Sequence, residues 1–116
     1  ISSWDVSSAT KMNVMFHGAT SFNQNISGWD VSNVIHMSSM FAYASSFNCD
    51  ISNWNVSRVM DMHWMFDGAS SFSSANLLDW NVSSNCKLYR MFDGAPNIDQ
   101  EALNWENLEL RLSNYD

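Results

Sequence analysis

A pattern of about 25 residues occurs four times in this chain, and it restricts the fold more than any other feature of the sequence. Its most regular part is a Trp-x-Val-Ser segment, whose tryptophans are separated by 25, 25 and 26 residues. The four segments are Ile1–Ser7, Ile26–Ser32, Ile51–Ser57 and Leu77–Ser83. A unit this short cannot bury its own apolar face, so its stability has to come from stacking on its neighbours.

The second half of each copy repeats as well. A Met-Phe pair is followed by an alanine three residues after the phenylalanine, and then by a further apolar residue. The pairs are Met15-Phe16, Met40-Phe41, Met65-Phe66 and Met91-Phe92. These landmarks define the repeats 1–25, 26–50, 51–76 and 77–101, and they place the one extra residue in a loop insertion near 73–76.

Residues 102–116 keep Trp105 in register but lose the rest of the pattern. They are either a degenerate fifth strand or a C-terminal cap, since terminal repeats are commonly atypical. The whole chain, residues 1–116, is therefore predicted to be a single solenoid domain.

Each copy predicts one strand and one short helix. The Trp-x-Val alternation predicts a strand near residues 3–7. The apolar residues after it have the spacing of one helical face, with Ser32 at an N-cap position and glycines such as Gly18 at the C′ position. The predicted fold class is α/β, a leucine-rich-repeat-like solenoid with one parallel strand plus one short helix per repeat. Its tryptophans would form one interior ladder of Trp4, Trp29, Trp54, Trp80 and Trp105.

The combination of Ile-x-x-Trp-x-Val with Met-Phe-x-Gly-Ala-x-Ser-Phe, over residues 1–98, resembles the BspA-like leucine-rich repeat surface proteins. The variant it is most similar to is a repeat of unknown function in mycoplasma surface lipoproteins. Phe16, Ala19 and Phe22 match the Ala-Phe-x-x-Cys-x-x-Leu segment of the BspA-like proteins, with Met15 replacing its Ala and Ala19 its Cys. The resemblance implies a non-enzymatic role in adhesion or ligand binding, at the cell surface or outside the cell.

The charge of the chain excludes two classes of partner. There are 5 basic and 12 acidic residues, a net charge of −7, which repels nucleic-acid phosphates and leaves no basic cluster for anionic membranes. No apolar run approaches the length of a membrane span. We therefore expect neither nucleic-acid binding nor direct membrane insertion of this segment.

Enzymatic, metal and cofactor chemistry are not expected either. The repeated serines lack a Gly-x-Ser-x-Gly motif and a nearby base, and helix capping explains them better. His17, His36 and His63 occupy different repeat positions, so we expect three surface histidines rather than a metal site. Cys49 and Cys86 also differ in repeat position, and a bridge between them is not expected.

One candidate binding surface is a polar row on the outside of the predicted strands. It consists of Asp5, Asp30, Asn55 and Asn81. Stacked carboxylates and amides could hydrogen-bond a sugar or a peptide strand. The alternative is a solvated polar face whose side chains bond one another.

A second candidate is an aromatic pair where the copies differ. Position 14 of the repeat is occupied, in the alignment of the four copies, by Val14, Ser39, Trp64 and Tyr89. Trp64 and Tyr89 would lie on the outer helix surface in adjacent copies, where exposed aromatic side chains favour partner binding. Lateral packing within the solenoid is the alternative.

Three Asn-x-Ser sequons, at Asn25, Asn55 and Asn81, are candidate glycosylation sites.

Two functions are consistent with these features. The first is an extracellular or cell-surface recognition module that binds a protein or glycan ligand. The second is a structural filament subunit that self-associates end to end, because the first strand would otherwise present an open apolar edge with Ile1 and Trp4. Either preceding sequence or another subunit is expected to cover that edge.

Overall fold

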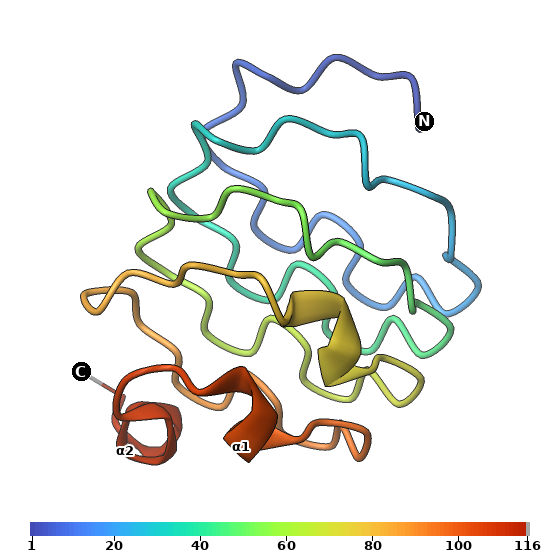
Figure 1. The fold of residues 1–116 in the computed structure, drawn as a ribbon. Coiled ribbons are helices and arrows are strands. Elements are labelled where there is room, and N and C mark those ends of the chain that lie inside the picture. The colour runs from blue at the N-terminus through green and yellow to red at the C-terminus, as the bar shows by residue number, and fades with distance from the viewer. Residues whose placement is uncertain (116) are drawn as a thin grey trace.

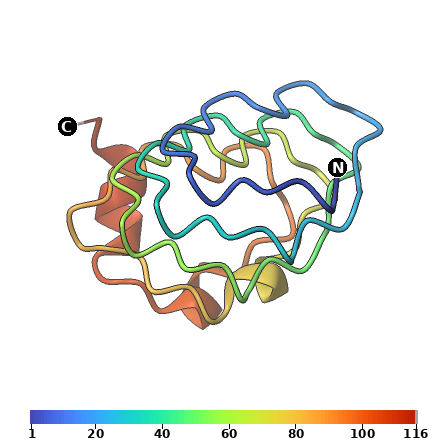
Figure 2. The same cartoon turned by 90° about the horizontal axis from the view of Figure 1, so that it is seen from above.

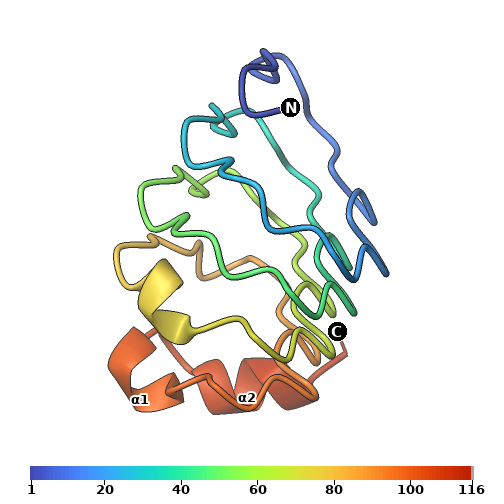
Figure 3. The same ribbon diagram turned by 90° about the vertical axis from the view of Figure 1, so that its right-hand side faces the viewer.

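The computed structural model describes residues 1–115, and its chain runs in successive layers, one for each repeat (Figure 1). Seen from above, each turn of chain outlines a flattened ring, and the rings lie over one another (Figure 2). The first repeat lies at one end of the stack, and the C-terminal helices lie across the other (Figure 3). The molecule measures 37 × 26 × 22 Å.

Backbone hydrogen bonds join the layers with the period of the sequence. The N–H of Met12 donates to the carbonyl of His36 at 2.8 Å, and the N–H of Met37 donates to that of Asp61 at 2.9 Å. Single parallel β-bridges link Lys11, His36, Asp61 and Lys87. Each bridge is isolated, so residues 1–115 contain no β-sheet.

The strand predicted near residues 3–7 does not form. The N–H of Trp4 bonds to the carbonyl of Ile1 at 3.0 Å, and the N–H of Ala9 bonds to that of Val6 at 2.9 Å. These are turn bonds within one copy. The second and third copies repeat both, and the fourth repeats the first, from the N–H of Trp80 to the carbonyl of Leu77. Because the turns use the backbone donors locally, no ladder between neighbouring layers can form here.

The helix predicted in each repeat does not form either. Val14 and Gly18 have φ angles of 53° and 70°, and Ser39 and Tyr43 in the next repeat have 56° and 59°. A right-handed helix requires negative φ throughout, so these residues interrupt it twice per copy. The predicted α/β leucine-rich-repeat-like solenoid, with a strand and a helix in every repeat, is therefore wrong.

The described helices are short and lie in the second half of the chain. They are the 3₁₀-helix η1, Ser74–Leu77, and the α-helices α1, Gln100–Leu103, and α2, Leu108–Ser113. η1 forms where the extra residue was predicted, and the Ser73 side chain caps it by accepting from the N–H of Ala75. The site of the insertion is confirmed, although it folds as a helical turn rather than a loop.

The C-terminal segment caps the stack. The Asp99 side chain accepts from the N–H of Ala102 at the start of α1. Arg111 in α2 donates from Nη2 to the carbonyls of Ser83 and Cys86, at 2.7 and 2.8 Å. The fifth-strand alternative is therefore wrong, since its leucines belong to a helix.

The interior agrees with the predicted ladder. Trp29, Trp54 and Trp80 are 3–5% exposed, whereas Trp4 in the first layer is 54% exposed. Trp80 stacks on Trp105 with 6.3 Å between ring centroids. Behind the tryptophans run phenylalanine stacks with centroid spacings of 5.6 to 6.0 Å: Phe16, Phe41, Phe66 and Phe92, and beside them Phe22, Phe47 and Phe72. Such offset aromatic contacts stabilise a core beyond the area they bury.

Candidate functional site

The polar row predicted from the sequence is exposed, but its oxygen atoms also hold turns. Asp5 accepts hydrogen bonds from the backbone N–H and the hydroxyl of Ser7, at 3.0 and 2.6 Å. The same turn joins Asp30 to Ser32 and Asn55 to Ser57. Asn81 is also exposed, but its serine differs: the Ser83 hydroxyl accepts from the N–H of Asn85.

These turns also affect ionisation. The hydroxyl of Ser7, followed by its backbone N–H, lowers the pKa of Asp5. Ser32 lowers the pKa of Asp30 by the same two bonds. Hydrogen bonds to a carboxylate stabilise its charged form. The row therefore has a local structural role, whatever else it binds.

The three sequon asparagines, Asn25, Asn55 and Asn81, are all exposed. The side-chain oxygen of Asn25 accepts from the N–H and hydroxyl of Ser27, at 3.0 and 2.7 Å. Glycan attachment at these positions stays a prediction.

The register of the predicted aromatic pair needs a correction. Trp64 has a φ angle of 54°, and its counterpart in the fourth layer is Arg90, with 51°. Tyr89 is therefore the counterpart of His63, because the insertion shifts this repeat by one residue. Tyr89 and Trp64 are nevertheless in contact, with their rings T-shaped and 5.6 Å apart between centroids. They lie on outer turns rather than on a helix surface.

This contact is part of a larger group, the aromatic cluster, which consists of His63, Trp64, Tyr89 and Tyr115. Tyr115 lies 4.9 Å from Tyr89 and stacks on His63 at 5.7 Å, measured between ring centroids. The guanidinium carbon of Arg90 lies 5.2 Å from the Tyr89 centroid. Trp64 and Tyr89 are half-buried, and Tyr115 is 61% exposed, so the cluster is packed on one side and open on the other.

The expectation of three surface histidines is wrong for His63. Only 14% of its side chain is exposed, and its Nδ1 lies 2.8 Å from Oδ1 of Asp61. Its Nε2 is buried without a hydrogen-bond partner. The aromatic cluster thus surrounds a polar ring, which the differing repeat positions of the histidines did not indicate.

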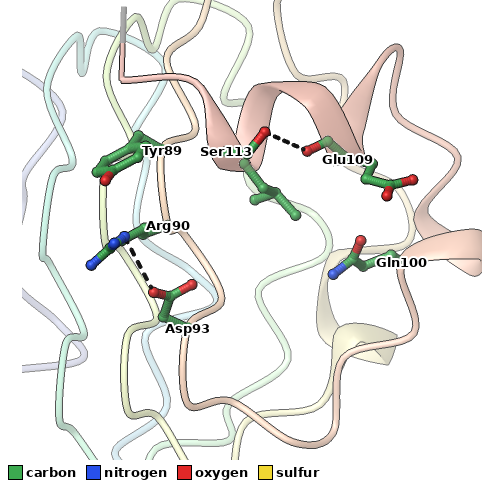
Figure 4. A pocket seen from close by; sticks show the side chains of 7 residues that line it. Tyr89, Arg90, Asp93, Gln100, Glu109 and Ser113 are labelled. Atoms are coloured by element: carbon green, nitrogen blue, oxygen red, sulfur yellow. Dashed lines mark hydrogen bonds and ion pairs between the residues drawn. The ribbon is translucent and has the colours of Figure 1, made fainter.

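Two hollows lie along the same outer side. The edge hollow, about 510 Å³, is lined by Lys11, Asn13, His36 and Asp61 from the first three layers. The end hollow, about 490 Å³, lies between the outer turn of the fourth layer and the C-terminal helices (Figure 4). Its walls are Tyr89, Arg90 and Asp93 on one side, and Gln100, Glu109, Leu112 and Ser113 on the other.

Within residues 1–115, no group of three or more His, Cys, Asp or Glu side chains could hold a metal ion. Cys49 and Cys86 are both free thiols, and burial raises the pKa of Cys86 to about 12. In the same part of the chain, no helix has the length and apolar character needed to cross a membrane.

Sequence reasoning missed His63, Tyr115 and Arg90 as members of this surface. Counting the insertion in the fourth copy would have aligned His63 with Tyr89, and Trp64 with Arg90. Nothing in the pattern places Tyr115, because it follows the last recognisable repeat.

A family model described as "Mycoplasma protein of unknown function, DUF285" matches residues 1–108. No curated protein matches the chain. No solved structure matches it either.

Proposed function

This chain belongs to the Mycoplasma protein family of unknown function DUF285, and from that premise we propose that it is a non-enzymatic recognition module that acts outside the cell. The family suggests a surface location. We further propose that the module serves in adhesion or ligand binding, with a protein or glycan as its partner. The similarity of its repeats to those of BspA-like surface proteins supports this role.

The observation that carries the proposal is a division between constant and variable positions. The constant Trp, Ile and Phe residues fill the interior and join the layers. The outer turns instead carry side chains that vary from copy to copy, with only lysine recurring, in the first column. Their first column is Lys11, His36, Asp61 and Lys87, their second is Asn13, Ser38, His63 and Tyr89, and their third is Val14, Ser39, Trp64 and Arg90. A constant scaffold with a variable outer edge is the usual arrangement of repeat proteins that bind partners.

The aromatic cluster is the centre of the proposed surface. Trp, Tyr and Arg are the residue types that dominate binding energy at interfaces, and Trp64, Tyr89 and Arg90 lie together here. Flat aromatic faces can also pack against sugar rings or apolar side chains of a protein. The edge hollow continues the surface toward the first layer.

A non-enzymatic role is consistent with how the repeated polar residues are used. The hydroxyls of Ser7, Ser32 and Ser57 donate to the acidic or amide residue two positions earlier. Those bonds stabilise turns, so the recurrence of the serines is explained by a structural role.

Binding by purified variants tests the proposal. The unaltered protein is applied to an array of host glycans and extracellular proteins, and the affinity for each bound component is measured. Trp64→Ala and Tyr89→Ala should each weaken binding about tenfold or more, as loss of an interface hot spot does. Tyr43→Ala is the matched control, because Tyr43 is 51% exposed but lies outside the cluster. Equal affinities for all four proteins would refute the role of the cluster.

Head-to-tail assembly into a filament is the second candidate. It has less support, because α1 and α2 lie against the fourth layer, where the first layer of another copy would have to stack (Figure 3).

A further inference from the structure

A pair of backbone N–H groups in each outer turn joins one layer to the next. In the first layer, the N–H of Phe16 donates to the carbonyl of Met40 at 2.9 Å, and the N–H of Gly18 donates to that of Ala42 at 2.8 Å. The second and third layers form the same two bonds, at distances of 2.6 to 2.9 Å. In every case the acceptors are two carbonyls from alternate residues of a neighbouring backbone.

The fourth layer has the same pair of donors without acceptors. Its N–H groups belong to Phe92 and Gly94, and neither has a hydrogen-bond partner among residues 1–115. The local backbone is the same as in the layer before, since Gly94 and Gly68 both have a φ angle of 67°. The two donors therefore face the C-terminal side of the stack, as their equivalents do.

The C-terminal helices provide a hydrogen-bond acceptor for only one of the backbone donors in this outer turn. The carbonyl of Leu112, in α2, accepts from the N–H of Arg90 at 2.9 Å. Beyond that bond the end hollow lies between α2 and the outer turn of the fourth layer, which lines it with Tyr89, Arg90 and Asp93 (Figure 4). Phe92 and Gly94 are the chain neighbours of Asp93 on either side. The volume of the end hollow, about 490 Å³, lies in the roughly 300–1,000 Å³ range of ligand pockets.

The charges around the hollow favour a basic group. Arg90 Nε lies 3.6 Å from Asp93 Oδ2, so the one cation of the lining already has a carboxylate beside it. Glu109, on the opposite wall, has no ion-pair partner within the described part of the chain. The chain as a whole has a net charge of −7, which repels anionic ligands.

We propose that the end hollow binds an extended segment of a partner polypeptide. Two carbonyls of this segment, from alternate residues, accept hydrogen bonds from the N–H groups of Phe92 and Gly94. The same pair of bonds joins each of the first three layers to the layer after it. A Lys or Arg side chain of the segment lies against Glu109. A complete repeat cannot take this place, because α1 and α2 already cover the rest of the layer. This site is distinct from the aromatic cluster and the edge hollow of the proposed function. The group it recognises is a peptide backbone.

Amide exchange and NMR titration of the ¹⁵N-labelled chain test the site directly. In the free protein, the amides of Phe92 and Gly94 should exchange with solvent much faster than those of Phe66 and Gly68, which are bonded to the fourth layer. The blocked peptide acetyl-Ala-Lys-Ala-Lys-Ala-amide should then shift the Phe92 and Gly94 amide signals and slow their exchange. The signals of Phe66 and Gly68 are the internal control and should not move.

Two comparisons test the chemistry of the ligand. The same peptide with glutamine in place of lysine should bind about twofold to fivefold more weakly, as expected for loss of one exposed ion pair. Glu109→Gln should abolish that difference and leave the shifts of the two amides in place. Protection of Phe92 and Gly94 in the free chain, peptide shifts located elsewhere, or equal shifts with sodium phosphate at the same concentration would each overturn the proposal.

Discussion

The indole N–H of Trp54 donates a hydrogen bond to the backbone carbonyl of Ile26, 3.1 Å away in the preceding repeat. Trp80 makes the same bond to Ile51 at 2.8 Å. One residue type therefore fills the interior of its own layer and fastens that layer to the one before. This explains why the tryptophan is retained in a repeat whose outer positions vary.

Truncation of a buried ladder residue should be far more costly than truncation of the exposed one. Trp54→Ala should lower the free energy of unfolding by about 3–5 kcal/mol, because it leaves a large cavity and removes the bond to Ile26. Trp4→Ala, at the exposed end, should cost about 1 kcal/mol or less. Urea denaturation measures both, and equal losses would contradict the ladder.

Gly68 should not tolerate a side chain. A Cβ at this position would lie 2.5 Å from Cδ1 of Tyr43, and the φ angle of 67° is itself unfavourable for alanine. Gly18→Ala is the matched control, because Gly18 has a similar φ of 70° but nothing within 4 Å of its Cβ.

We therefore expect Gly68→Ala to destabilise the fold by about 1 kcal/mol more than Gly18→Ala, as overpacking does. Tyr43→Ala in the Gly68→Ala background should recover that excess, since it removes the clash. Chemical denaturation of the double variant measures this, and no recovery would show that the clash has another source.

The Asp30 turn should be sensitive to acid. Hydrogen bonds from Ser32 lower the pKa of Asp30 below its ordinary value of 3.8, so the turn is stabilised above that pH. The stabilisation is lost as the pH falls through the lowered folded-state pKa. Ser32→Ala should move the pKa of Asp30 back toward 3.8. Carboxyl NMR titration measures it, and an unchanged pKa would mean that the hydroxyl does not contact the carboxylate in solution.

The two thiols should differ in reactivity. Burial raises the pKa of Cys86 to about 12, so at pH 8 almost none of it is the reactive thiolate. Cys49 is only half-buried. Iodoacetamide in the native state should therefore modify Cys49 first, as peptide mass spectrometry can establish. The Cys49→Ser variant should remain almost unmodified, and rapid labelling of that variant would contradict the burial of Cys86.

The interior of this protein could be predicted from the sequence, whereas the path of the backbone could not. The positions of Trp54 and Phe41 follow from periodicity, because stacked copies place like residues over one another. The outer turns depend on left-handed backbone at Ser39 and Trp64, which no residue preference indicates. The helix-like spacing of apolar residues therefore identified buried positions correctly, but the backbone that carries them is not helical.

The candidate site was predicted in part. Trp64 and Tyr89 do lie together, although the alignment that paired them was one residue out in the fourth copy. The polar row is exposed, but the turn bond between Asp5 and Ser7 could only be seen once the segment was known not to be a strand. The end hollow depends on the two C-terminal helices, which follow no repeat and left no periodic signal.

If constant positions hold the stack and variable outer positions bind the partner, two tryptophans should respond to truncation in opposite ways. Stability and ligand affinity are measured for Trp54→Ala and Trp64→Ala, with affinity determined at a temperature where both variants are folded. Trp64→Ala should keep most of the stability of the unaltered chain, because its side chain is only half-buried, and should lose about tenfold or more in affinity. Trp54→Ala should lose stability and keep its affinity. Unchanged affinity in Trp64→Ala, or a loss of stability in that variant as large as in Trp54→Ala, would contradict the account.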